Sequence, residues 1–107
     1  MKLGIIISTN IAETNWNALR LANMSITKGD EVSIFFLGEG VEYEKSSSDK
    51  FNINQQVETF LKSDKAKVLA CGTCLKFRNQ AGSETCPISG LTELYELIAS
   101  SDKVIIF

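Results

Sequence analysis

The chain has 107 residues, of which 44% are hydrophobic and 22% are charged, a balance typical of a single folded domain over 1–107 and not of a disordered segment. The formal net charge of −2 provides no basic excess that would replace phosphate counterions, so nucleic acid is not expected as the primary partner. The sequence contains no histidine, which excludes Cys–His nucleophiles and histidine metal ligands.

Four short apolar runs predict β-strands, and they lie in chain order at 3–8, 32–37, 67–70 and 103–107. Each run is nearly continuous in Ile, Val, Leu and Phe rather than alternating, as expected for parallel strands covered on both faces. The first run is too short to cross a membrane and does not have the form of a signal peptide. We therefore expect a cytoplasmic protein that has no membrane partner.

Amphipathic helical patterns fill the intervals between these runs. The first helix is predicted to use Glu13 as a capping-box partner and to stop at Gly29. The predicted N-cap residues of the three helices are, in chain order, Asn10, Asn52 and Ser89. The last helix carries an apolar stripe made of Leu91, Leu94, Tyr95 and Ile98. This alternation of strands and helices is typical of a right-handed, mostly parallel α/β sheet.

The loops that follow the predicted strands contain the candidate pocket residues. Ligands of an open α/β sheet bind at the carboxyl ends of its strands, which here are followed by 8–10, 38–40 and 71–74. Thr9, Asn10 and Gly40 are therefore expected to line a pocket. The polar stretch 38–50 is predicted to be a solvated loop with a short helical turn at 41–45.

Cys71 and Cys74 lie where the third predicted strand runs into a helix. The N–H groups of a helix start favour a thiolate over a thiol, and the segment after the cysteines carries no acid. We expect the pKa of such a thiol to fall by about one unit. The residues predicted to stabilise the thiolate are Thr73, Lys76 and Arg78.

Three kinds of sulfur chemistry fit this pair. A Cys-x-x-Cys sequence at a helix start is typical of dithiol–disulfide exchange, although an aromatic residue or proline usually separates those cysteines. A zinc site would use Cys71, Cys74 and Cys86, but it lacks a fourth cysteine or histidine ligand. In a sulfur carrier, a thiolate accepts a persulfide sulfur and passes it on. Because of the missing ligand, no metal is expected. The glycines match no phosphate-binding or dinucleotide fingerprint, so no cofactor is expected either.

The segment 70–78, the final helix and the ending 101–107 resemble the DsrE/DsrF-like family. The resemblance implies a three-layer α/β/α fold with a mostly parallel sheet of four or five strands, and assembly as a homo-oligomer, either a trimer or a hexamer. It also implies, for the sulfur-relay branch, that a cysteine persulfide carries sulfur between a donor protein and an acceptor protein. The branch's sulfur-accepting cysteine and the arginine seven residues later correspond to Cys71 and Arg78. Asn79 stands where a glycine commonly follows that arginine.

The leading hypothesis from the sequence is a small sulfur carrier in which Cys71 bears the persulfide. Cys74 is then either the resolving thiol or an alternative carrier, because other members of the family have a cysteine at that position. A dithiol–disulfide redox protein and a non-catalytic oligomeric binding module stay open as alternatives.

Overall fold

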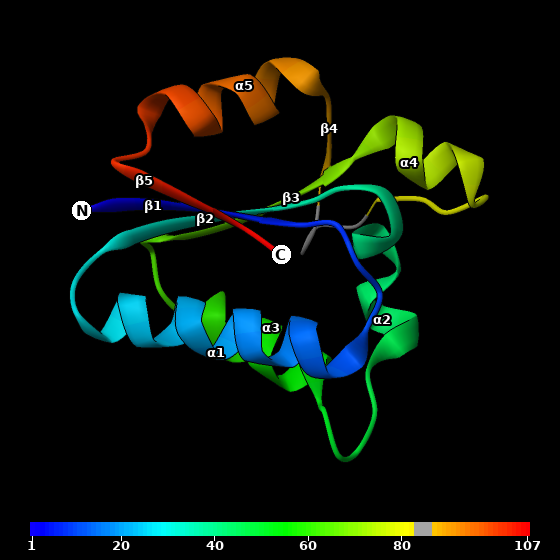
Figure 1. Cartoon of the computed structure of the whole chain (residues 1–107), viewed down its shortest axis with the longest axis horizontal. Coiled ribbons are helices and arrows are strands. Elements are labelled where there is room, and N and C mark those ends of the chain that lie inside the picture. The colour runs from blue at the N-terminus through cyan, green and yellow to red at the C-terminus, as the bar shows by residue number, and fades with distance from the viewer. Residues whose placement is uncertain (83–86) are drawn as a thin grey trace.

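A five-stranded parallel sheet forms the middle layer of the computed structural model, which describes residues 1–82 and 87–107 (Figure 1). Its strands are β1 (Lys2–Ile7), β2 (Glu31–Phe36), β3 (Ala66–Cys71), β4 (Ile88–Ser89) and β5 (Lys103–Ile106). They are hydrogen-bonded in the order β4-β3-β2-β1-β5, and every neighbouring pair is parallel. The predicted parallel α/β sheet is confirmed.

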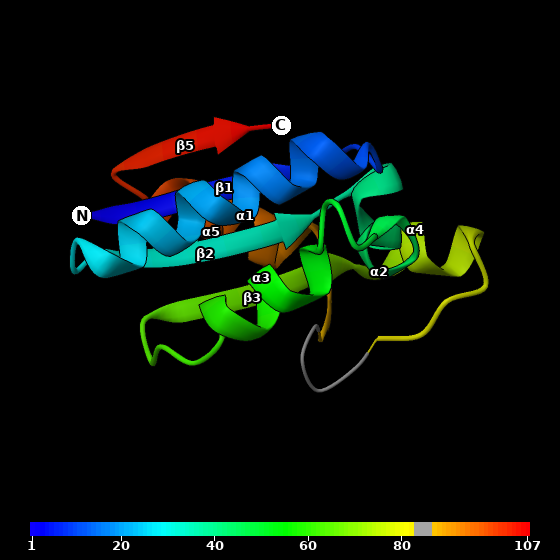
Figure 2. The same cartoon turned by 90° about the horizontal axis from the view of Figure 1, so that it is seen from below.

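Helices cover both faces of the sheet, so the fold has three layers (Figures 1 and 2). On one face lie α1 (Ala12–Thr27) and α3 (Ile53–Phe60), and on the other lies α5 (Leu91–Ser100). At the carboxyl ends of β2 and β3 lie the 3-10 helix η1 (Gly38–Glu42), α2 (Tyr43–Ser46) and α4 (Gly72–Phe77). Among the described residues, no helix is both long and apolar enough to span a membrane.

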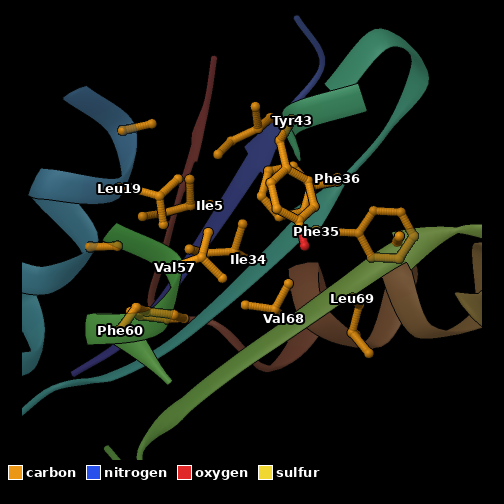
Figure 3. Close-up of a cluster of buried hydrophobic side chains, with 14 of the residues drawn as sticks. Ile5, Leu19, Ile34, Phe35, Phe36, Tyr43, Val57, Phe60, Val68 and Leu69 are labelled. Atoms are coloured by element: carbon orange, nitrogen blue, oxygen red, sulfur yellow. The ribbon is translucent and has the colours of Figure 1, made fainter. Parts of the chain in front are cut away.

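The core between the sheet and the helices α1 and α3 fixes the position of α2 (Figure 3). Phe36, the last residue of β2, is fully buried, and its ring stacks on that of Tyr43 with 4.2 Å between ring centroids. Such a ring pair adds attraction beyond the burial of apolar area. The chain therefore turns back over the end of the sheet directly after β2. The stretch 38–50 is not simply the solvated loop that was predicted, because Gly40, Val41 and Tyr43 are buried.

Two of the three predicted helix starts are wrong. In α1 the N-cap residue is Ile11, without a side-chain cap, and Asn10 precedes it. Thr9 takes over the local hydrogen bonding there, because its hydroxyl accepts from Ile11 N and its carbonyl accepts from Asn15 Nδ2. Ser89 belongs to β4, where it pairs with Cys71, and α5 begins at Leu91.

The third predicted cap is confirmed, since Asn52 Oδ1 accepts a hydrogen bond from Gln55 N at 3.0 Å. The apolar stripe of α5 is largely exposed. The exposed fractions of three stripe residues are 76% for Leu91, 71% for Tyr95 and 46% for Ile98. The buried residue of α5 is Leu97, which is not part of the predicted stripe.

Candidate functional site

The two cysteines form a close thiol pair at the junction of β3 and α4. Cys71 is both the last residue of β3 and the N-cap of α4, and its Sγ accepts from Cys74 N at 3.4 Å. The two Sγ atoms lie 2.9 Å apart, and both cysteines are reduced. A side-chain acceptor that caps a helix start normally contributes an oxygen, and here the sulfur of Cys71 takes that place.

Strand β4 holds the outer side of this junction. Ser89 pairs with Cys71, and Ala70 N donates to the carbonyl of Pro87 at 3.1 Å. A Cβ atom on Gly72 would lie 2.6 Å from Cγ2 of Ile88, so the absence of a side chain lets β4 approach the pair closely. The result is that Cys71 is buried, with 8% of its surface exposed, whereas Cys74 is half-buried.

The 3-10 helix η1 approaches the pair from the end of β2. Gly38 N lies 3.2 Å from Cys74 Sγ and donates a hydrogen bond to it. Gly38 has a φ of +56°, in the left-handed region that glycine adopts without a side-chain penalty. Gly40 packs against the backbone at the end of β1, and a Cβ atom there would overlap the carbonyl oxygen of Ile7. These two glycines place the N–H of Gly38 on the sulfur.

Arg78 does not direct its charge at a sulfur atom. Its Nε donates to Oε1 of Glu42 at 2.6 Å, and its Nη1 donates to the carbonyl of Cys74 at 3.1 Å. Arg78 therefore contacts the backbone of Cys74 and the end of η1. The side chains of Thr73 and Lys76 are exposed, and Thr73 contributes its backbone N–H to Cys71.

Burial raises the pKa of the Cys71 thiol above its ordinary value, and the side-chain hydrogen bond with Cys74 and the charge of Cys74 act in the same direction. The backbone N–H groups of Cys74 and Thr73 oppose this shift without reversing it. The lowered pKa expected at the helix start is therefore wrong for Cys71. At neutral pH this thiol is held in its protonated form.

Two other predicted pocket residues, Thr9 and Asn10, lie in the loop between β1 and α1. Thr9 is half-buried and bonded within its own loop, and Asn10 is exposed. Within 1–82 and 87–107, no hydrogen bond joins either of them to a cysteine. A cavity of about 280 Å³ lies instead beside the strand end that precedes the thiols, and its lining includes Tyr43, Lys45, Ala70, Leu75 and Gln80.

Glu42 is the site residue that the sequence does not reveal. Its partner Arg78 is 36 positions away, and no local periodicity relates two residues at that separation. The described part of the chain contains no cluster of three or more cysteine, aspartate or glutamate side chains that would hold a metal ion. Cys86, the third ligand of the zinc site considered above, lies outside the described residues.

Comparison with known proteins places this arrangement in a family. The model of the DsrE/DsrF-like family matches residues 1–107. The uncharacterized protein MJ0989 of Methanocaldococcus jannaschii is 30% identical over 100 residues, which cover 89% of this chain and 88% of that protein. The uncharacterized protein MK0008 of Methanopyrus kandleri is 29% identical over 100 residues, which cover 89% of this chain and 83% of that protein.

The crystal structure of the ychN protein from E. coli has the same fold, with a TM-score of 0.82 over 100% of both chains at 24% sequence identity. The family match covers every strand and helix described above, including the junction that carries the two thiols. The chain therefore belongs to the DsrE/DsrF-like family.

Proposed function

We propose that this protein is a sulfur carrier that accepts a sulfane sulfur on its Cys71–Cys74 pair and passes it from a donor protein to an acceptor protein. Membership of the DsrE/DsrF-like family supports a role related to sulfur relay in general terms. The observation that supports the finer proposal is the thiol pair itself, with 2.9 Å between its sulfur atoms and an N–H group from a separate segment directed at one of them.

Cys74 is the thiol that bears the persulfide in this proposal, in place of Cys71. It is the more exposed of the two, and Gly38 N donates to its sulfur. Cys71 is buried with a raised pKa, which disfavours the thiolate form that nucleophilic attack requires.

The transfer needs no external oxidant. The Cys74 thiolate attacks the outer sulfur of a donor persulfide, the sulfur–sulfur bond of the donor breaks, and the donor leaves as a thiolate. A persulfide is thereby formed on Cys74. An acceptor thiolate then attacks the outer sulfur of this persulfide, which returns Cys74 to its thiolate form and leaves the sulfur on the acceptor. The sulfur of Cys71 lies 2.9 Å from that of Cys74, within hydrogen-bond distance of the reacting sulfur.

Loading with inorganic polysulfide, followed by intact mass spectrometry, tests the proposal. We expect the wild type and the Cys71→Ser variant to gain about 32 Da, the mass of one sulfur atom, as a persulfide. The Cys74→Ser variant should lose most of this gain, and the Cys71→Ser Cys74→Ser double variant should lose all of it. A full gain in the double variant would refute the proposal. If the wild type instead loses two hydrogens reversibly and gains no sulfur, the dithiol–disulfide alternative is correct.

We also propose that the protein forms a homo-oligomer, either a trimer or a hexamer. The exposed apolar side chains of α5 support this, since monomeric proteins rarely expose contiguous apolar patches of large side chains. Native mass spectrometry of the wild type should show the oligomer, and Tyr95→Glu should shift it toward the monomer. Thr92→Glu, which adds the same charge at an exposed polar position of α5, is the control. A wild type that is monomeric at micromolar concentration contradicts this proposal.

A further inference from the structure

An ion pair fastens η1 to the segment that carries the thiols. Arg78, directly after α4, and Glu42, the last residue of η1, approach to 2.6 Å between Nε and Oε1. Each side chain is 26% exposed, so water screens the pair less than it screens an ion pair on the open surface. Both views of the fold show α4 beside the turn that leads into α2 (Figures 1 and 2).

The ion pair closes a ring of contacts around Cys74. Arg78 Nη1 donates to the carbonyl of Cys74 at 3.1 Å, and Gly38 N donates to the sulfur of the same cysteine at 3.2 Å. Gly38 and Glu42 are the first and last residues of η1, so the backbone of this short helix joins the two contacts. Any movement of η1 away from α4 would lengthen both the ion pair and the hydrogen bond to the sulfur.

We propose that Glu42 and Arg78 are positioning residues that hold the N–H group of Gly38 against the sulfur of Cys74. This rests on the proposed function, in which Cys74 is the nucleophile. A hydrogen bond to a charged acceptor is stronger than one to a neutral acceptor, and it weakens steeply when its geometry is lost. The pair therefore supports the thiolate through geometry, and neither of its two side chains touches the sulfur.

Gln80 adds a second link between the same two segments. With its amide oxygen turned toward α2, it accepts from Lys45 Nζ at 2.9 Å and donates to the carbonyl of Val41 at 3.3 Å. The charged or titratable groups on the elements around Cys74 are Cys71 and Lys67 on β3, Lys76 and Arg78 on or after α4, and Glu39, Glu42, Tyr43, Glu44 and Lys45 on η1 and α2.

The sign of the effect of Glu42→Ala separates positioning from direct electrostatics. Removal of a negative charge near Cys74 would by itself favour the thiolate and lower the pH midpoint of Cys74 alkylation. Loss of the Glu42–Arg78 ion pair has the opposite effect on this midpoint, because the N–H of Gly38 moves away from the sulfur of Cys74. We expect the midpoint to rise by about one pH unit, a tenfold loss of thiolate at a given lower pH. The measurement is iodoacetamide labelling across pH, with each cysteine assigned by fragment-ion mass spectrometry.

Matched variants complete this test. Glu42→Gln keeps an oxygen that accepts from Arg78 Nε and should restore most of the wild-type midpoint. Glu39→Ala removes the same charge from the same helix but leaves the Glu42–Arg78 ion pair in place, and it should leave the midpoint of Cys74 alkylation unchanged or slightly lower. A midpoint that falls in Glu42→Ala, or that stays the same while thermal stability drops, overturns the proposal. Because alkylation needs no sulfur donor, failure of polysulfide loading with the expected midpoint shift would refute the carrier function and leave the positioning roles intact.

Discussion

Gly40→Ala should lower the free energy of unfolding by about 3 kcal/mol, the upper end of the range for inserting an extra carbon into a packed site. The added Cβ would overlap the carbonyl oxygen of Ile7, which is backbone at the end of a central strand and cannot move aside as a flexible side chain can. Either β1 or η1 must shift. Urea denaturation followed by circular dichroism gives the free energy.

Gly29→Ala is the matched control for this prediction. Gly29 has a φ of +90°, and a Cβ atom there would meet nothing within 4 Å. The same chemical change therefore costs only the backbone penalty of a left-handed residue, about 1–2 kcal/mol. If Gly40→Ala is no less stable than Gly29→Ala, the close approach of η1 to β1 is wrong, and with it the placement of Gly38 on the sulfur of Cys74.

Alkylation of Cys71 should begin at a lower pH in the Cys74→Ser variant than in the wild type. The hydrogen bond between the two thiols and the charge of Cys74 both raise the pKa of Cys71, and the substitution removes the sulfur responsible. The serine hydroxyl instead donates to a Cys71 thiolate and favours it. Burial, the largest cause of the raised pKa, stays in place, so the midpoint should remain above that of an ordinary thiol.

The measurement is again iodoacetamide labelling across pH, read at Cys71. In the wild type, Cys74 should be labelled before Cys71 at every pH, because it is more exposed and Cys71 is held as a thiol. A Cys71 midpoint that rises in Cys74→Ser, or a wild type in which Cys71 reacts first, would show that Cys71 is the leading nucleophile after all.

The sequence was sufficient for four of the five strands and for the location of the thiols, because both depend on local patterns. Continuous apolar runs identify four of the parallel strands, and the run that ends in Cys71 places the pair at a strand end. The prediction that every such strand is covered on both faces is wrong for β5, at the edge of the sheet, where Ile106 is 68% exposed. Strand β4 has only two residues and forms by pairing with Ala70 and Cys71. Two residues are too few to show a hydrophobic pattern, so the sequence does not predict this strand. Its pairing also takes Ser89 away from the predicted helix start.

The rest of the site depends on contacts between distant segments. The polar composition of 38–50 predicts a solvated loop, whereas the stacking of Tyr43 on Phe36 and the close approach of Gly40 to β1 bury part of it. The prediction of a lowered thiol pKa considered only the N–H groups of a helix start. Burial of Cys71 has the larger, opposite effect on its pKa, and a sequence does not show how deeply a thiol is buried.

Asn79 illustrates a departure from a family pattern that the fold explains. It stands where a glycine commonly follows the arginine, and its φ is +52°. Glycine is favoured in this left-handed region, and asparagine enters it more readily than most other residues do. The backbone after α4 therefore keeps the conformation that a glycine would adopt, and Arg78 keeps its place beside Glu42.

Peptide mapping after loading with isotopically labelled polysulfide tests sulfur carriage by this thiol pair most directly. Trypsin cleaves after Lys67, Lys76, Arg78 and Lys103, so Cys71 and Cys74 fall in the peptide 68–76 and Cys86 falls in 79–103. We predict that the labelled sulfur lies in 68–76 and that fragment ions assign it to Cys74. Label confined to 79–103, or no label in either peptide, would contradict sulfur carriage by the Cys71–Cys74 pair.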